Sequence, residues 1–254
     1  MTLFMASVCN VEEARVALAG GVDIIDIKEP RAGALGAVAT EQAVAIVRAA
    51  GGGVLTSATV GDIPLIPQSL RAAIVSTARS GASVIKFGLF PGNLAACLDM
   101  LSRLSVSYTF VAVIFADAPP PMEIRPLMAA LSDAGVKGAV LDTAVKTYSL
   151  LEHLTPSRIA AFADGAHAHG LIAGLAGGLQ PDDIPVLMPL PPDILGFRGA
   201  LCTGGRAGEI AAAHVARVRH LIPRNASIER RVHDMLAMTK KQVSGENAVD
   251  GCRQ

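Results

Sequence analysis

The sequence predicts a (β/α)8 barrel, the TIM-barrel architecture, because short apolar runs alternate with amphipathic segments along most of its 254 residues. Eight runs rich in Val, Ile, Leu and Ala have the length and composition of buried strands. We expect these strands at 3–8, 22–28, 54–60, 83–88, 109–116, 138–142, 171–175 and 193–198. We expect the helices that follow them at 11–19, 40–50, 68–80, 94–104, 121–134, 156–168, 182–188 and 208–221.

The composition agrees with a core of small aliphatic side chains. Half of the residues are apolar (51%), Trp is absent, and only 4% are aromatic, which suits parallel strands covered by helices better than a β-sandwich. A doubly wound open sheet is the alternative, but no Gly-x-Gly-x-x-Gly loop follows the first predicted strand. We expect one barrel domain over 1–222, then a C-terminal helix and a flexible tail over 223–254.

Charge and cysteine content exclude several classes of function. The 22 basic residues balance 22 acidic ones, and no basic stripe with interleaved aromatics indicates a nucleic-acid partner. The four cysteines lie far apart without a Cys-x-x-Cys or Cys/His cluster, so we expect free thiols and no metal site. No apolar run reaches the ~18 residues of a membrane helix, and no signal peptide is visible. We therefore expect a cytoplasmic protein without a membrane partner; its alanine-rich helices permit a homo-oligomer.

Side-chain parity places charged groups inside the predicted barrel. Along the second strand, Asp26 and Lys28 share one face, and two isoleucines occupy the other, which must face the helices. The same argument turns Lys86, Asp142 and Arg198 inward from the fourth, sixth and eighth strands. Alternate strands contribute to the same layer of a barrel interior, so we expect these groups to converge.

The convergence of lysines and aspartates predicts chemistry at the carboxyl end of the barrel. An ammonium is costly to bury unless it is paired or loses its proton, and crowded ammonium groups lower one another's pKa. One lysine can then attack a carbonyl as a free amine while another moves protons. The candidate catalytic residues are Lys28, Lys86, Asp26, Asp142 and Lys146. The alternative is that the lysines only form buried ion pairs.

Glycine-rich segments follow the seventh and eighth predicted strands, where barrels commonly bind phosphate. Glycines allow backbone N–H groups to approach an anion, and a following helix adds its dipole. We expect a phosphorylated small-molecule substrate, with Arg206 nearby, bound by Gly177, Gly178, Arg198, Gly199, Gly204 and Gly205. Plain turns, and a solvated Arg206, are the alternatives.

Other candidates have weaker support. Asp62 and Asp117 follow predicted strands as site residues do, but either could serve as a cap instead. The loop 30–37 could be a lid or a plain turn. His167 and His169 are two apart on a helix and point to different faces, so they do not form a metal pair.

Five segments together resemble one enzyme family, the (5-formylfuran-3-yl)methyl phosphate synthases of methanofuran biosynthesis. The resemblance covers about residues 3–221, and its Asp-Ile-Lys and Asp-Thr-Ala-Val-Lys motifs are fairly specific in combination. The segments that carry it are Gly-Val-Asp-Ile-Ile-Asp-Ile-Lys-Glu-Pro-Arg-Ala-Gly-Ala-Leu-Gly-Ala, Ser-Ala-Thr-Val-Gly-Asp-Ile-Pro, Val-Ile-Lys-Phe-Gly-Leu, Leu-Asp-Thr-Ala-Val-Lys and Gly-Phe-Arg-Gly-Ala-Leu-Cys.

The resemblance implies condensation of two glyceraldehyde 3-phosphate molecules into a furan aldehyde that carries one phosphomethyl group. One phosphate and two waters leave, no net oxidation occurs, and we expect no cofactor. Lys28 matches the family's Schiff-base lysine and Lys86 its proton acceptor, while Asp26, Asp142 and Lys146 match further polar site residues.

Two features depart from the archaeal pattern of the family. Glu29 stands where an amide is common, and the segment after Pro223 has no counterpart. Because other barrel enzymes also use an Asp-x-Lys strand, a class I aldolase, a phosphosugar lyase or a decarboxylase is the alternative function. A non-catalytic barrel that binds a phosphorylated metabolite is a more remote one.

Overall fold

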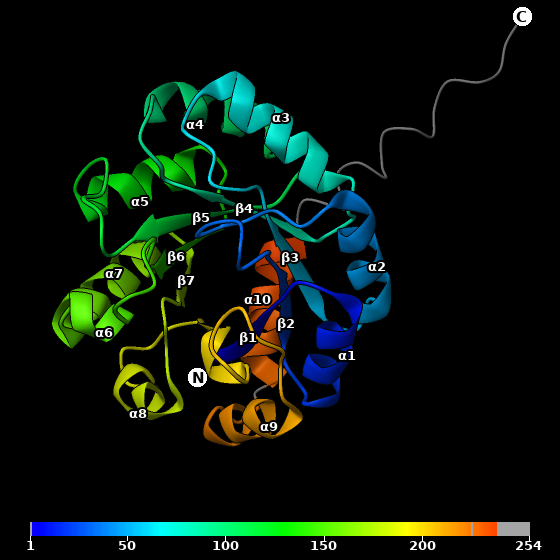
Figure 1. Ribbon diagram of the computed structural model, residues 1–254. Helices are drawn as coiled ribbons and strands as arrows, with labels where there is room; N and C mark the ends of the chain where they lie inside the picture. Colours follow the sequence, from blue (N-terminus) through cyan, green and yellow to red (C-terminus); the bar gives the residue numbers. More distant parts are fainter. Residues whose placement is uncertain (1, 225, 238–254) are drawn as a thin grey trace, which may run out of the picture.

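Eight parallel strands close into a barrel in the computed structural model, which describes residues 2–224 and 226–237 (Figure 1). The strands pair in sequence order, and β8 pairs with β1 to close the sheet. The strands are β1 Leu3–Val8, β2 Ile24–Ile27, β3 Leu55–Thr59, β4 Val84–Gly88, β5 Phe110–Phe115, β6 Gly138–Asp142, β7 Ile172–Leu175 and β8 Ile194–Phe197. The predicted barrel is confirmed, and each strand begins and ends within two residues of its predicted bounds.

Helices surround the barrel, and their apolar faces pack on the outer face of the sheet (Figure 1). They are α1 Val11–Ala19, α2 Thr40–Ala50, α3 Pro67–Ala78, α4 Leu94–Leu104, α5 Ile124–Asp133, α7 Pro156–Ala168 and α9 Ala212–Leu221, with the short α6 Leu150–His153 and α8 Ile184–Leu187 and the 3₁₀ turns η1 Pro181–Asp183 and η2 Gly199–Leu201. No helix among the described residues is long and apolar enough to cross a membrane.

Three helix predictions need correction. The helix expected from residue 121 begins at Ile124, because consecutive prolines at 119–121 favour extended backbone before it. The helix expected from 208 begins at Ala212, because Ile210 instead forms a bridge with Cys202. The helix expected over 182–188 divides into η1 and α8, and α6 and η2 were not predicted.

A further helix, α10 Ala226–Ala237, closes the amino end of the barrel. Val232 and Leu236 are buried in the same apolar cluster as Leu3, at the start of β1, and Ile194, at the start of β8. The Arg231 guanidinium of α10 pairs with the carboxylate of Asp193, which directly precedes β8. The helix predicted after the barrel therefore contributes to its core, whereas the predicted flexible tail lies outside the described residues.

A substitution of Leu236 tests whether the packing of α10 on the amino end of the barrel stabilises the fold. Replacing Leu236, which is 4% exposed, by Ala should lower the free energy of unfolding by about 2–4 kcal/mol, because a buried methyl-rich side chain is lost and a cavity remains. Urea unfolding followed by circular dichroism measures the change. The exposed His233→Ala on the same helix is the control, with an expected effect within about 0.5 kcal/mol. Equal effects of the two substitutions would contradict the packing.

Candidate active site

A cavity of 540 Å³ opens at the carboxyl ends of the strands. Its wall combines inward side chains of β1, β2, β4 and β6 with the loops that follow β6, β7 and β8. All five candidate catalytic residues line it, as do Gly177, Gly178, Arg198, Gly199 and Gly205, whereas Gly204 is not part of the lining. The groups that parity turned inward therefore meet in one place.

Asp26 is the centre of the deeper half of the cavity and is fully buried. Lys86 Nζ donates to Asp26 Oδ1 over 3.0 Å, Ser57 Oγ donates to the same oxygen over 2.6 Å, and Ser7 Oγ donates to Oδ2 over 2.8 Å. Burial alone would raise the pKa of Asp26, but the ammonium groups of Lys86 and Lys28 and the Ser57 hydroxyl outweigh it and lower that pKa. Asp26 is thus held as a carboxylate.

The two serines were missed by the sequence analysis. Ser7 and Ser57 lie on β1 and β3, beside Asp26 in the register of the sheet. The alternation of side chains along those strands could have predicted that both serines point inward. A serine in a strand does not by itself indicate a functional site, however. Only the pairing of β2 with its two neighbours gives the hydroxyls a role.

Asp142 organises the second half of the cavity. Lys28 Nζ donates to Asp142 Oδ2 over 3.4 Å, and Lys146 Nζ donates to Oδ1 over 2.6 Å. The backbone N–H of Thr143 also donates to Oδ1, over 2.7 Å. Burial opposes ionisation of Asp142, but the charges of Lys28 and Lys146 and these hydrogen bonds hold its pKa well below the usual range.

Lys146 lies on the loop between β6 and α6 rather than on a strand. Besides Asp142, its ammonium contacts the carbonyl oxygen and the hydroxyl of Thr143. Burial and the nearby charge of Lys28 lower the pKa of Lys146, and the attraction of Asp142 only partly offsets them. Lys146 therefore releases its proton more readily than an ordinary lysine.

Contrary to the prediction, the guanidinium of Arg198 is not available to a ligand in the cavity. It forms a buried, bidentate ion pair with Glu13 of α1. Its remaining N–H groups donate to backbone carbonyls of Arg206 at 2.9 Å, Gly208 at 3.0 Å and Ser7 at 3.2 Å. Because five N–H donors are thereby used, the expectation that Arg198 binds phosphate directly does not fit the geometry. It shapes the loop between β8 and α9 instead.

Arg206 has the free charge that Arg198 lacks. The other four cations of the lining each have a carboxylate partner. Within residues 2–224 and 226–237, no carboxylate oxygen lies within 4.0 Å of the Arg206 guanidinium. Its hydrogen bond is to the backbone oxygen of Gly33, over 3.1 Å. Arg206 is thus the lining residue best placed to bind an external anion.

The glycine loops after β7 and β8 contribute Gly177 and Gly205 to the cavity wall that also contains Arg206. Gly177 has φ of 96°, and a Cβ there would lie 2.9 Å from the backbone nitrogen of Thr143, so only glycine fits without a shift. Gly204 and Gly205 have positive φ and open space around them, which is typical of a turn. The predicted phosphate loop is therefore partly a turn and partly cavity wall.

An apolar cap covers the β4 and β5 side of the barrel mouth. Leu35, from the loop between β2 and α2, is buried against the inward face of β4, where a Cβ on Gly88 would lie 2.9 Å from its Cδ1. The ring of Phe90 packs on that of Phe115 with 4.9 Å between centroids. Lys86 is only 4% exposed beneath this mouth, and the loops that line the cavity follow β6, β7 and β8 on the opposite side.

The two ambiguous aspartates hold loops and do not line the cavity. Asp62 accepts the backbone N–H groups of Ala34 and Leu35 over 2.8 and 2.6 Å. Asp117 accepts those of Ala144 and Val145 over 2.7 and 2.6 Å. Each aspartate therefore fixes the loop of a neighbouring strand and caps no helix of its own.

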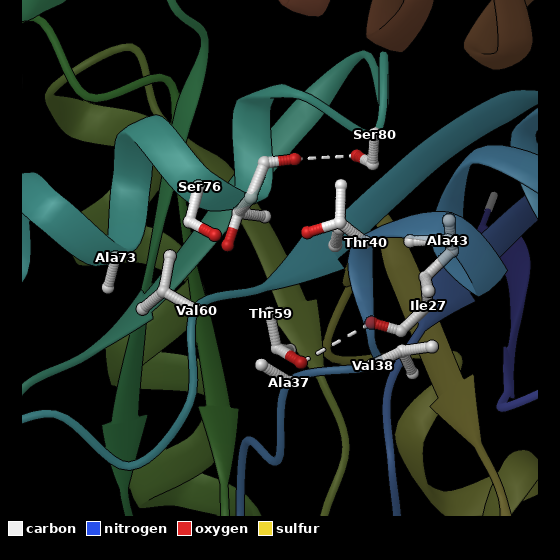
Figure 2. Close-up of a pocket in the computed structure, with 12 residues that line it drawn as sticks. Ile27, Ala37, Val38, Thr40, Ala43, Thr59, Val60, Ala73, Ser76 and Ser80 are labelled. Carbon is white, nitrogen blue, oxygen red and sulfur yellow. Dashed lines mark hydrogen bonds between the residues drawn. The ribbon is translucent and has the colours of Figure 1, made fainter.

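A second, smaller cavity of 130 Å³ lies in the layer between the sheet and helices α2 and α3 (Figure 2). Its polar lining consists of hydroxyl groups such as those of Thr40, Thr59 and Ser76, and no ionisable side chain is present. Thr59 Oγ1 donates to the backbone oxygen of Ile27 over 3.3 Å (Figure 2). This smaller cavity therefore has none of the acid–base groups found at the barrel mouth.

Comparison with known proteins decides the family. The family model described as 4-HFC-P synthase matches residues 4–219. The chain is 37% identical over 214 residues to (5-formylfuran-3-yl)methyl phosphate synthase of Methanocaldococcus jannaschii, which covers 80% of this chain and 91% of the relative. This chain belongs to the (5-formylfuran-3-yl)methyl phosphate synthase family. A putative synthase of Methylorubrum extorquens is 39% identical over 84% of this chain and 88% of that protein.

The solved structures most useful for comparison share the fold at low identity. A phosphoribosyl anthranilate isomerase from Thermus thermophilus matches with a TM-score of 0.61 and 17% identity, over 87% of this chain and 98% of that chain. A 3-hexulose-6-phosphate synthase matches with a TM-score of 0.62 and 14% identity, over 87% and 100%. All five candidate catalytic residues of this synthase family member lie within the matched range 4–219.

The lowered pKa of Asp142 predicts the acid stability of the fold. A carboxyl whose pKa is lower in the folded than in the unfolded state stabilises fully above about pH 5, and this contribution is lost as the pH falls. Asp142→Asn should therefore flatten the fall of unfolding free energy between pH 5 and 3, by up to about 1.4 kcal/mol per pH unit. Urea unfolding at several pH values measures this slope. Asp99→Asn, in an exposed pair with Arg103, is the control; the same slope in all three proteins would contradict the assignment.

Proposed function

We propose that this protein condenses two glyceraldehyde 3-phosphate molecules into (5-formylfuran-3-yl)methyl phosphate through a Schiff base on Lys28. The observation that carries the proposal is the gathering of three lysine ammonium groups on two buried carboxylates in one cavity. Membership of the synthase family supports the product. The stoichiometry loses one phosphate and two waters, so electrons balance without an oxidant or a reductant.

Stability does not account for this cluster. Replacing buried ion pairs by well-packed apolar residues is often neutral or stabilising, by roughly 1–4 kcal/mol. A barrel selected only for stability would gain little from lysines at three positions of its mouth. Around Asp26 and Asp142 the lining has three ammonium groups for two carboxylates, and Arg206 adds a further positive charge; Glu152 and Asp183 belong to the same lining but make no ion pair with these lysines. This excess suits phosphorylated substrates.

Lys28 is the lysine best placed to act as nucleophile. Its contact with Asp142, 3.4 Å, is the longest of the three lysine–carboxylate contacts, and Asp142 retains Lys146 at 2.6 Å when Lys28 leaves. Lys28 can therefore exchange its ion pair for a covalent bond without leaving a buried carboxylate unpaired. Its amine attacks the aldehyde carbon of one triose phosphate, and loss of water gives the imine.

Lys86 is placed to move the proton that the next step requires. Asp26 holds its ammonium at 3.0 Å, and the hydroxyls of Ser7 and Ser57 orient that carboxylate. After losing its proton, Lys86 accepts the α-proton of the imine and leaves an enamine. Phosphate leaves from the carbon adjacent to the enamine, and a carbon–carbon bond forms to the second triose phosphate, in either order. Ring closure with loss of two waters forms the furan. Hydrolysis of the imine takes up one water, as many as its formation released, and frees the product and Lys28.

Product analysis tests the proposal. Purified protein incubated with glyceraldehyde 3-phosphate alone should form a phosphorylated furan aldehyde and one phosphate per furan, detected by mass spectrometry and a phosphate assay. Lys28→Arg should abolish product, because it keeps the charge and loses the nucleophile. Lys137→Gln, at the amino end of β6 and away from the cavity, should retain activity. A six-carbon bisphosphate sugar would indicate an aldolase instead, and unchanged substrate with folded protein would contradict the proposal.

Arg206 should act in phosphate binding. Arg206→Gln should raise the KM for glyceraldehyde 3-phosphate at least tenfold and weaken competitive inhibition by inorganic phosphate, because the unpaired cation of the lining is lost. Initial-rate kinetics with phosphate as inhibitor measure both effects. The control is Arg217→Gln, whose guanidinium forms an exposed pair with Asp182 and should leave KM unchanged. Equal KM values in the two variants would contradict the role of Arg206.

A further inference from the structure

We propose that Asp117 is a positioning residue that places Lys146 over Asp142 by fixing the backbone of the loop 143–149. Its catalytic consequence rests on the proposed function, since it requires Lys146 to take part in the reaction. The placement of Lys146 itself does not depend on that function. The two parts can therefore be tested separately.

Asp117 is itself held firmly at the end of β5. The N–H of Ala116 donates to the backbone oxygen of Asp142 over 2.7 Å, which extends the pairing of β5 with β6 by one step. The N–H of Ala118 donates back to the oxygen of Phe115 over 3.4 Å and forms a turn. The Asp117 carboxylate therefore projects from a fixed point of the sheet.

The carboxylate of Asp117 holds two consecutive peptide groups of the neighbouring loop. Oδ1 accepts the N–H of Ala144 over 2.7 Å, and Oδ2 accepts the N–H of Val145 over 2.6 Å. Hydrogen bonds to a carboxylate are among the stronger ones in proteins. Using both oxygens fixes the orientation of the loop as well as its distance from β5.

Lys146 directly follows these two peptide groups, and α6 does not begin until Leu150. The side chain of Val145 is 64% exposed, and Ala144 is only partly buried against the apolar cluster, so apolar packing alone holds this part of the loop weakly. The Lys146 ammonium nevertheless reaches back to Asp142 and Thr143 at the start of the loop. Because the lysine side chain is a flexible four-carbon stem, the position of its backbone decides whether the ammonium reaches both groups.

Asp117 acts through position rather than through its charge. The pKa of Lys146 is lowered by burial and by the charges of Lys28 and Arg206, and it is raised by Asp142. The carboxylate that pairs with Lys146 is Asp142, whereas Asp117 binds the backbone N–H groups of Ala144 and Val145. Releasing the loop would expose Lys146 and separate it from the charged side chains around it, so its pKa would return toward that of an ordinary lysine.

Amine labelling measures the placement without reference to the reaction. Trace acetylation of the folded protein at a series of pH values, read at the Lys146 peptide by mass spectrometry, gives the pKa and the accessibility of that amine. In Asp117→Asn, whose amide accepts only one of the two N–H groups, the midpoint should move to higher pH and the limiting rate at high pH should rise severalfold. Asp117→Glu, which keeps the charge and shifts the carboxylate by one methylene, should change both in the same direction and is the second variant if Asp117→Asn fails to fold.

The matched control is Asp62→Asn. Asp62 binds two backbone N–H groups of the loop between β2 and α2 in the same manner and does not contact the loop of Lys146. This variant should leave the labelling of Lys146 unchanged. Unchanged labelling in both Asp117 variants, or an equal shift in Asp62→Asn, would overturn the proposal.

Kinetics then test the catalytic consequence. Asp117→Asn should lower kcat at least tenfold with a smaller change in KM. On a Lys146→Gln background, it should lower the remaining activity less than twofold, because both substitutions remove the same contribution. Altered labelling with unchanged kcat would support the positioning and overturn the role of Lys146 in the reaction. An undiminished effect of Asp117→Asn on the Lys146→Gln background would overturn action through Lys146.

Discussion

Two buried carboxylates, Asp26 and Asp142, make the interior of this barrel possible. Each ammonium in the cavity is costly to remove from water and needs a partner, and these carboxylates supply partners to all three lysines. Truncating either aspartate would leave a buried charge unpaired, at a cost of roughly 3–5 kcal/mol. Strand register and loop conformation at the barrel mouth therefore have to keep both carboxylates in place, and the hydroxyls of Ser7 and Ser57 fix one of them.

The rest of the barrel interior provides the rigid frame for that charged layer. Apolar side chains fill the interior below it, and α10 covers the amino end with Val232 and Leu236. Leu35 and Phe90 cover the mouth on one side, and the loops that line the cavity lie on the side of β6 to β8. The loops on that side are tied down by charged side chains: Asp117 holds the loop of Lys146, and the buried Glu13–Arg198 pair holds the loop of Arg206. This division separates parts that stabilise the fold from parts that bind and react.

The strands and the inward lysines could be predicted because a buried strand has a period of two, so Asp26 and Lys28 must share a face. The roles of residues whose partners lie far away in the sequence could not be predicted. Glu13 and Arg198 are 185 residues apart, and nothing local in either segment shows that the arginine is fully occupied by an internal partner. The loop-holding role of Asp117 likewise appears only when β5 and β6 lie side by side. Helix starts after prolines and glycines were the least accurate local predictions, because turn geometry determines them.

The proposed reaction requires Lys28, and not another lysine of the cluster, to form the covalent bond to the substrate. Reduction with borohydride in the presence of glyceraldehyde 3-phosphate, followed by peptide mass spectrometry, tests it directly. We expect one reduced adduct on the peptide that contains Lys28, and no adduct in Lys28→Arg. An adduct on Lys86 or Lys146 in the unmodified protein, or furan formation that continues in Lys28→Arg, would contradict it.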